Sequence, residues 1–308
     1  MLHDPALLKA TTANLEYMPE QPGYIYFEPG PQRSVLLDAA EASMLAYARY
    51  PARRLAQPEF TRILGQSGLS LIRTFGDFFA DHASTGRGFF AANDERALLA
   101  FRGTEADNFC DVLADGDLLL MPDERIHGRG ALVHRGFQRY LRSLWPKVEA
   151  TVDGWRHSHP NGEICITGHS LGAALATLAF AYLADPGTSL YTFGCPRVGN
   201  KPFSSQIEEA ALRQPCFRVV DNKDLVTHVP LALGNLAYVH PSIPVLWIDG
   251  NGAMIENPSP PLRDAPVIGD VVTWYAGKLF RKLHLSLPGP LADHSPVRYC
   301  HWIAQNAP

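Results

Sequence analysis

A serine between two glycines is the part of this sequence best suited to chemistry. The pentad Gly168-His-Ser-Leu-Gly172 places the hydroxyl of Ser170 at the centre of a Gly-x-Ser-x-Gly pattern. An apolar, partly β-branched run, Ile164 to Thr167, precedes it, and a run rich in Ala and Leu follows at once. Strand, tight turn and helix in this order project a serine hydroxyl clear of a sheet, and the glycines avoid collisions with neighbouring backbone. The pattern therefore predicts that Ser170 is a nucleophile.

Such a serine needs a base to remove its proton and a carboxylate to orient that base. In sheets of this kind the acid, and after it the histidine, follow the serine along the chain. Asp221 and Asp224 both come after the apolar run Phe217–Val220, so the residues alone leave both open as the acid. His294 lies on a loop before the last predicted helix, from which it can fold back over the end of the sheet. We favour His294 as the base.

Other reactive side chains are interpreted as structural. His169 adjoins the serine, but the turn that exposes Ser170 directs its neighbour elsewhere, so we expect a packed or partly buried histidine. The five cysteines show neither the paired spacing of a zinc site nor a dense disulfide framework: Cys110, Cys165, Cys195, Cys216 and Cys300. Those in apolar runs are expected to pack as small hydrophobic residues. We expect no metal and no cofactor.

The elements that must position these residues alternate along the second half of the chain. The expected order is strand to Thr167, helix to Leu183, strand Ser189–Phe193, helix Lys201–Leu212 and strand Cys216–Val220. Apolar strands that alternate with helices predict a mostly parallel sheet covered by helices on both faces. Further on we expect a hairpin of Tyr238–Val239 with Val245–Ile248, a surface loop over 257–266, a helix from Val267 to about Leu283, and a last helix over about Ser295–Ala304.

The first half is predicted to contribute helices and a hairpin. After an N-terminal arm over 1–33, Ser34 can cap a helix that ends near Tyr50, and a second helix is expected from Glu59 to about Thr74. Gly88–Ala92 and Arg96–Phe101 predict a β-hairpin that leads into the sheet. The segment 105–122 is polar at first and then apolar, which suits a flap over a pocket. A further helix is predicted from Gly136 to about Trp155, where apolar residues recur with helical periodicity.

Composition favours an ordinary globular chain of one domain over residues 1–308. Of its 308 residues, 46% are hydrophobic and 19% charged, and the formal net charge is −4. This charge gives no reason to expect nucleic-acid binding. The N-terminus lacks a basic segment followed by an apolar one, and the longest apolar run, 173–184, is too short to span a bilayer. We expect a cytoplasmic location or export by a non-classical route; oligomeric state is left open.

Several motifs, in order over roughly residues 87 to 300, make the chain resemble the class 3 (fungal-type) lipases of the α/β-hydrolase fold. They are Leu99-Ala-Phe-Arg-Gly-Thr104, Val133-His-Arg-Gly-Phe137, Ile166-Thr-Gly-His-Ser-Leu-Gly-Ala173, Thr192-Phe-Gly-Cys-Pro-Arg-Val-Gly-Asn200, Arg218-Val-Val-Asp-Asn-Lys-Asp-Leu-Val226 with Pro230, and Asp293-His294 before Tyr299. The resemblance implies a mostly parallel sheet flanked by helices, with a lid inserted at 105–122 after the Phe-Arg-Gly-Thr strand.

Position by position, the resemblance implies Ser170 as nucleophile, Asp224 as acid and His294 as base. It adds an oxyanion hole formed by Thr104 and by the backbone N–H of Leu171. His134 and Arg197 also match the family, and we expect them to hold loop and sheet junctions by hydrogen bonds.

The activity implied is metal-free hydrolysis of acylglycerols or related lipid esters, with a lipid–water interface as the place of contact. A phospholipase A1 and an esterase for small or feruloyl esters share the triad and stay open as alternatives. A catalytically silent lipase-like signalling module is the alternative outside enzymes, although all three triad residues are present. Phe109 stands where the family pattern has a Trp leading the lid helix.

Overall fold

Eight strands form the sheet that carries the candidate residues. The computed structural model describes residues 27, 33–47, 55–79, 87–103, 119–183, 185–222, 224–230, 238–258 and 294–306. The strands lie in the order β1 (Ser70–Phe75), β2 (Gly88–Ala92), β3 (Arg96–Phe101), β6 (Glu163–His169), β7 (Thr188–Phe193), β8 (Cys216–Asp221), β9 (Val245–Ile248) and β10 (Met254–Glu256). From β3 to β9 neighbouring strands run parallel, and the pairs at both edges are antiparallel. The predicted mostly parallel sheet and the hairpin of β2 and β3 are confirmed.

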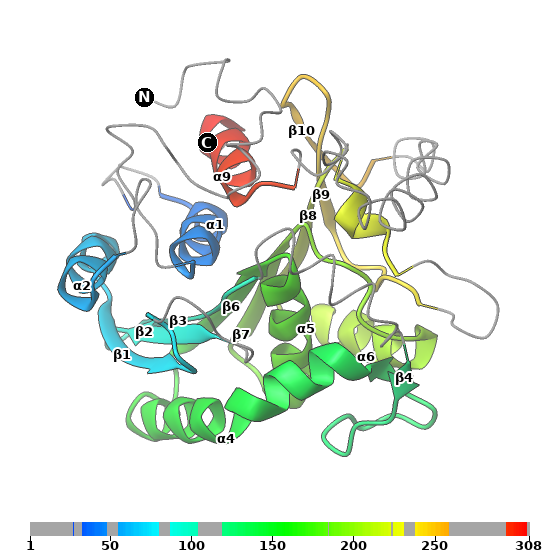
Figure 1. Cartoon of the computed structure of the whole chain (residues 1–308), viewed down its shortest axis with the longest axis horizontal. Coiled ribbons are helices and arrows are strands. Elements are labelled where there is room, and N and C mark those ends of the chain that lie inside the picture. Colours follow the sequence, from blue (N-terminus) through cyan, green and yellow to red (C-terminus); the bar gives the residue numbers. More distant parts are fainter. Residues whose placement is uncertain are drawn as a thin grey trace, which may run out of the picture.

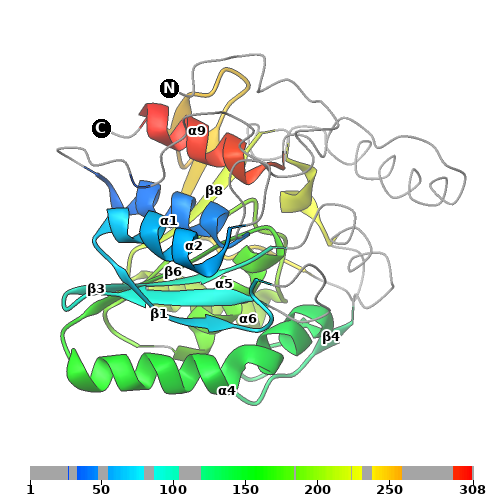
Figure 2. The same cartoon turned by 60° about the vertical axis from the view of Figure 1, so that its left-hand side comes forward.

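Helices cover both faces of this sheet, as Figures 1 and 2 show. One face carries α1 (Val35–Leu45), α2 (Gln57–Leu64) and α9 (Pro296–Asn306), and the other carries α4 (Arg135–Ser158), α5 (Leu171–Leu183) and α6 (Lys201–Ala211). The described chain also forms two 3₁₀ turns, η3 (Gly65–Ser67) and η4 (Leu225–His228), and a small sheet of β4 (Leu120–Met121) with β5 (Val133–His134). This arrangement of layers is the α/β-hydrolase fold that the sequence predicts.

Alternate side chains of the central strands enter two separate hydrophobic clusters. Ile164 and Ile166 of β6 pack with α4 and α5, whereas Cys165 between them packs on the face of α1 and α9. Because successive side chains of a strand point to opposite faces, a sheet covered on both faces needs apolar residues throughout. This explains why the central strands read as continuous apolar runs.

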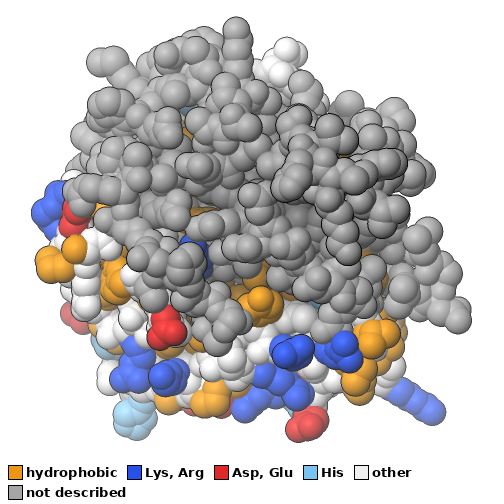
Figure 3. All heavy atoms as spheres, in the orientation of Figure 1, with side chains coloured by type: hydrophobic (Ala, Val, Ile, Leu, Met, Phe, Trp, Pro, Cys, Tyr) orange, Lys and Arg blue, Asp and Glu red, His pale blue; other side chains and the backbone are white. Residues whose placement is uncertain are grey.

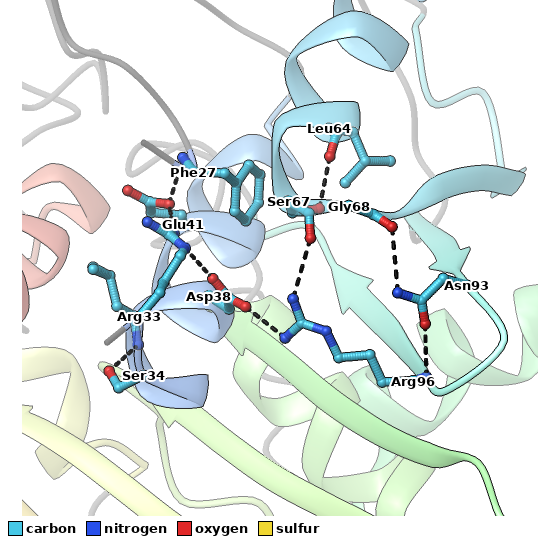
Figure 4. Close-up of polar contacts among 11 residues, drawn as sticks. Phe27, Arg33, Ser34, Asp38, Glu41, Leu64, Ser67, Gly68, Asn93 and Arg96 are labelled. Atoms are coloured by element: carbon cyan, nitrogen blue, oxygen red, sulfur yellow. Dashed lines mark hydrogen bonds and ion pairs between the residues drawn. The ribbon is translucent and has the colours of Figure 1, made fainter. Parts of the chain in front are cut away.

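A network of charged side chains fixes α1 on the sheet (Figure 4). The carboxylate of Asp38 accepts hydrogen bonds from the guanidinium groups of Arg33 and Arg96, the latter at 2.6 Å. Glu41 accepts from Arg33 and from the backbone N–H of Phe27, and Arg96 also donates to the carbonyl of Ser67 at 3.2 Å. Both carboxylates are buried, so the two arginines supply the charge that keeps them stable there.

The outward face of α4 is basic. Its buried side carries Phe137, Leu141 and Val148, while Arg142 and Lys147 are exposed. Figure 3 shows Lys and Arg side chains gathered on the lower part of the molecule, where α4 lies in Figure 1. The helical periodicity predicted from Gly136 to Trp155 therefore follows a buried apolar stripe.

Two predicted elements are wrong. The helix expected from Glu59 to Thr74 ends at Leu64 and η3, because Gly68 takes a left-handed conformation with φ of 75°, and Ser70–Phe75 forms β1 against β2. Only one residue of β1 is fully buried, so this edge strand has a weak apolar signal.

The second error concerns the hairpin at the other edge of the sheet. β9 pairs with β10, and not with Tyr238–Val239; instead Val239 forms an isolated bridge with Gly199. The last predicted helix is confirmed by α9. Most of the N-terminal arm over 1–33, the helix expected from Val267 to Leu283 and most of the loop over 257–266 lie outside the described residues.

Candidate active site

Ser170 occupies a single-residue turn between β6 and α5. Its φ is 60°, in a region that non-glycine residues rarely adopt and that costs free energy where it occurs. A Cβ on Gly168 would lie 2.3 Å from the backbone of Gly172, and one on Gly172 would lie 2.2 Å from the carbonyl oxygen of Phe101. These contacts confirm that the two glycines let the strand, the turn and the helix approach closely. They also bring the start of α5 against the end of β3.

Asp224 and His294 meet although 70 residues separate them in the chain. His294 Nδ1 lies 2.7 Å from Asp224 Oδ2, and both side chains are buried. The other carboxylate oxygen of Asp224 accepts a hydrogen bond from the backbone N–H of Val226, the second residue of η4. A carboxylate can only accept here, so Nδ1 of His294 carries a proton and Nε2 is the basic nitrogen.

Asp221, the alternative acid, has a different partner. Arg298 Nε donates to its Oδ2 at 2.6 Å, and this carboxylate is also buried. The geometry brings His294 to Asp224 and assigns Asp221 to a buried ion pair with α9.

Tyr299 is a residue of the site that we do not predict from the sequence. Its hydroxyl donates to Asp224 Oδ2 at 2.6 Å and accepts from the backbone N–H of Asp221 at 3.1 Å. Burial, together with the negative charges of Asp224 and Asp221, raises its pKa well above 10, so the phenol stays protonated. Its sequence signal is only its place five residues after His294; its role depends on where α9 packs.

Gly194 explains how β7 can end beside this pair. Its φ is 57°, and a Cβ there would lie 2.7 Å from Asp224 Oδ2 and 3.0 Å from His294 Nδ1. A larger residue would therefore displace the pair.

His169 is buried, as predicted, and packs between Tyr47 and His294. Its Nδ1 lies 2.9 Å from the hydroxyl of Tyr47, and its ring centroid lies 4.5 Å from that of His294. Burial, and then the charge of His294, lower the pKa of His169 well below 6.5. A neutral ring thus lies beside His294.

The Ser170 hydroxyl is buried and makes no hydrogen bond to any residue in the described part of the chain. Hydrogen bonds between nucleophile and base are often long in unliganded enzymes. The site therefore has the paired Asp224 and His294 on one side and the strained Ser170 turn on the other.

Of the two predicted oxyanion donors, only Leu171 lies within the described residues. Leu171 follows Ser170 as the first residue of α5, where backbone N–H groups have no partner within the helix. Thr104 lies outside the described residues, as does 105–118 of the lid-like segment. The rest of that segment, 119–122, includes β4, and Leu119 is 47% and Met121 39% exposed.

His134 and Arg197 hold junctions, as predicted. His134 caps α4 by accepting from the backbone N–H groups of Gly136 and Phe137. Arg197 donates to the carbonyl oxygens of His228 and Pro230. The described cysteines are buried and unpaired, and the described residues contain no cluster of three or more His, Cys, Asp or Glu that could hold a metal ion. None of the described helices is long and apolar enough to cross a membrane.

Several known lipases are similar to this chain in sequence and in structure. A family model described as Lipase (class 3) matches residues 98–234. The secreted mono- and diacylglycerol lipase 1 of Fusarium solani is 36% identical over 123 residues, which cover 39% of this chain and 35% of that protein. A lipase of Rhizopus niveus is 29% identical over 199 residues, which cover 60% of this chain and 46% of that protein.

Among solved structures, lipase II from Rhizopus niveus has a TM-score of 0.55 at 28% identity and covers 68% of this chain and 77% of that one. The chain spans less than half the length of the two curated relatives.

Proposed function

We propose that the chain is a serine carboxylester hydrolase that acts on acylglycerols or related lipid esters, because residues 98–234 match the family model described as Lipase (class 3). The observation that carries this proposal is the buried pair of Asp224 and His294, formed beside the turn that holds Ser170. The Fusarium relative is named a secreted mono- and diacylglycerol lipase, which supports both the substrate class and export.

The proposed reaction starts with attack of Ser170 Oγ on the ester carbonyl while Nε2 of His294 takes the hydroxyl proton. Asp224 holds the imidazole through Nδ1–H and stabilises the imidazolium. The backbone N–H of Leu171, with Thr104, would stabilise the negative charge on the carbonyl oxygen. His294 then protonates the departing alcohol, the carbon–oxygen bond to it breaks, and water cleaves the acyl-enzyme in the same way.

The exposed apolar side chains of Leu119 and Met121 support contact with a lipid–water interface. They lie at the end of the lid-like segment, on and beside β4. A substrate panel from short p-nitrophenyl esters through triacylglycerol emulsion to phospholipid and feruloyl esters separates a lipase from a phospholipase A1 and from a small-ester esterase.

The test of the proposal is Ser170→Ala, assayed with p-nitrophenyl esters of several chain lengths. Loss of the nucleophile is expected to lower kcat by about five to six orders of magnitude. A fluorophosphonate probe should label the unmodified chain and leave the variant unlabelled. Undiminished turnover by the variant, or an unlabelled Ser170 in the unmodified chain, would sink the proposal and favour the silent lipase-like module.

The acid is tested by comparing Asp224→Asn with Asp221→Asn. Asp224→Asn should lower kcat by about three to four orders of magnitude, because the amide no longer holds the reactive tautomer of His294. Asp221→Asn removes a negative charge that faces Arg298, so it should reduce stability and leave kcat within about tenfold. The reverse order of the two effects would assign the acid to Asp221.

A further inference from the structure

A polar cavity lies over β8 and β9, and Ser170 is not among its described lining residues. It has a volume of about 220 Å³, and its described lining includes Arg197, Arg218, His228, His240 and Trp247. Neither Asp224 nor His294 is among the described lining residues. The candidate active site thus does not account for this cavity.

The floor of the cavity is one face of the sheet. Arg218 lies on β8 between Cys216 and Val220, so all three point to the same face. Cys216 packs in the cluster of α4 and α5, and Val220 packs with Val245 and Trp247. A guanidinium group therefore lies on this face of the sheet, between two apolar residues of β8 and beside Thr192 of β7.

The walls add positive charge and hydrogen-bond donors. Arg197 reaches the cavity from the loop after β7, where its guanidinium bonds the carbonyl oxygens of His228 and Pro230, which are uncharged acceptors. His228 belongs to η4, and His240 follows the bridge at Val239. None of the described residues that line the cavity is Asp or Glu.

The pKa of His240 indicates the electrostatic potential inside the cavity. Its Nε2 lies 2.6 Å from the carbonyl oxygen of Thr227, which would favour the protonated ring. Burial, followed by the charges of Arg218 and Arg197, nevertheless lowers its pKa well below 6.5, and His228 acts in the same direction. The described groups around His240 therefore make the cavity positive.

The volume of the cavity limits which ligands can bind in it. Pockets for drug-sized ligands have volumes of about 300–1,000 Å³, and one water occupies about 30 Å³ of liquid volume. At about 220 Å³ the cavity is too small for a long acyl chain and larger than a single water needs. A compact anion with several acceptor oxygens matches this size, and arginine is the side chain best suited to bind one.

We propose that this cavity is a binding site for a phosphate group, held between Arg218 and Arg197 with His228 and His240 beside it. The phosphate could be free or carried as the monoester headgroup of a lipid or small metabolite, since both present the same oxygens. The site is independent of ester hydrolysis, and its test does not measure activity.

The test measures the melting temperature of the full chain as inorganic phosphate is added, against sodium chloride of equal ionic strength. A ligand that binds only the folded state raises the melting temperature with concentration. Phosphate should therefore raise it and chloride should not. The same titration with sn-glycerol 3-phosphate separates the sources: a response to both identifies a monoester site, and a response to inorganic phosphate alone identifies free phosphate.

Arg218→Gln should weaken phosphate binding by about tenfold or more, because hydrogen bonds to a charged group are lost. Arg213→Gln is the matched control, since Arg213 lies on the surface beside Glu209. This variant should respond to phosphate as the unmodified chain does. Equal responses of the two variants, or no difference between phosphate and chloride in the unmodified chain, would overturn the site.

A second pair of variants decides the question if Arg218→Gln does not fold. Val245 is the partner of Arg218 across β8 and β9 and also lines the cavity. Val245→Glu places a carboxylate opposite Arg218 and should abolish the response to phosphate. Val245→Gln has the same size without the charge and should keep the response. The same response in both variants would show that charge does not hold the ligand, which contradicts the proposal.

Discussion

Tyr299 and His294 share one oxygen of Asp224, and this shared contact determines how the carboxylate lies. The hydroxyl of Tyr299 and Nδ1 of His294 both donate to Oδ2, at 2.6 and 2.7 Å. Because Tyr299 also accepts from the backbone of Asp221, it links Asp224 to the end of β8. If Asp224 is the acid that we propose, Tyr299 positions it.

Tyr299→Phe should lower kcat by about tenfold and leave KM unchanged, because one hydrogen bond to the charged carboxylate is lost while the ring still packs. Steady-state kinetics with a p-nitrophenyl ester measures both constants. The matched control is Tyr191→Phe, since Tyr191 is also buried, on β7, with its ring stacked on Phe217. If both variants keep the same kcat, Tyr299 does not position Asp224.

How far single residues can be predicted depends on whether their signal is local. Ser170 is recognisable from its pentad and flanking runs, because the turn is built from neighbours in the sequence. Asp221 and Asp224 are equivalent by that criterion, and only the packing of α9 gives one of them His294 and the other Arg298. Tyr299 belongs to the motif of Asp293 and His294, but that motif does not indicate its contact with Asp224, which emerges only from the fold.

Among the elements, α5 begins in close contact with the sheet. Its second residue, Gly172, allows the helix to begin against the end of β3, because a Cβ there would lie 2.2 Å from the carbonyl oxygen of Phe101. Gly154, within α4, has open space where its Cβ would be. The two helical glycines thus serve different purposes.

Gly172→Ala should destabilise the fold by about 1–3 kcal/mol, because backbone atoms must move to accept the methyl group. Gly154→Ala is the control and should stabilise by about 0.5–1 kcal/mol, since alanine favours the helix and meets no neighbour. Chemical denaturation of both variants measures the free energies of unfolding. Equal effects of the two substitutions would mean that the close approach at Phe101 does not limit residue 172.

The predictability of an element depends on how evenly its residues are buried. The strands β6, β7 and β8 are covered on both faces and were recognisable as apolar runs between helices. β1 lies at an edge and has only one fully buried residue, and its residues fit a helical prediction instead. The sequence predicts β9 but not its partner, because the short strand β10 has no fully buried residue.

For the molecule as a whole, buried charges link the layers at points where apolar packing alone would not fix their alignment. Asp38 and Arg96 join α1 to β3 on one face of the sheet. On the other face, the buried carboxylate of Asp123 accepts hydrogen bonds from Gln138 and Arg142 of α4 and from Tyr182 of α5. The sequence indicates the layers through periodicity, but it does not indicate which charged residues join them.

Asp123 makes the stability of the whole chain decrease as the pH falls. Burial alone would raise its pKa, but the hydrogen bonds from Tyr182, the backbone of Arg125, Gln138 and Arg142 outweigh burial and lower it. The folded state therefore binds this proton less readily than the unfolded state, in which an aspartate has a pKa of about 3.9. The stabilisation is present above about pH 5 and is lost as the pH falls through 3.9 and then through the lower folded value.

Asp123→Asn should accordingly cost about 1–3 kcal/mol at pH 7, where the charged hydrogen bonds are fully formed in the unmodified chain. The difference in free energy of unfolding between the two proteins should shrink as the pH falls below about 4, because the unmodified chain then loses the same interaction. Urea denaturation at a series of pH values measures this difference. Glu124→Gln is the control, since Glu124 is exposed beside Asp123 and should change the free energy little at any pH. A difference for Asp123→Asn that stays constant down to pH 3 would show that this carboxylate does not couple stability to pH.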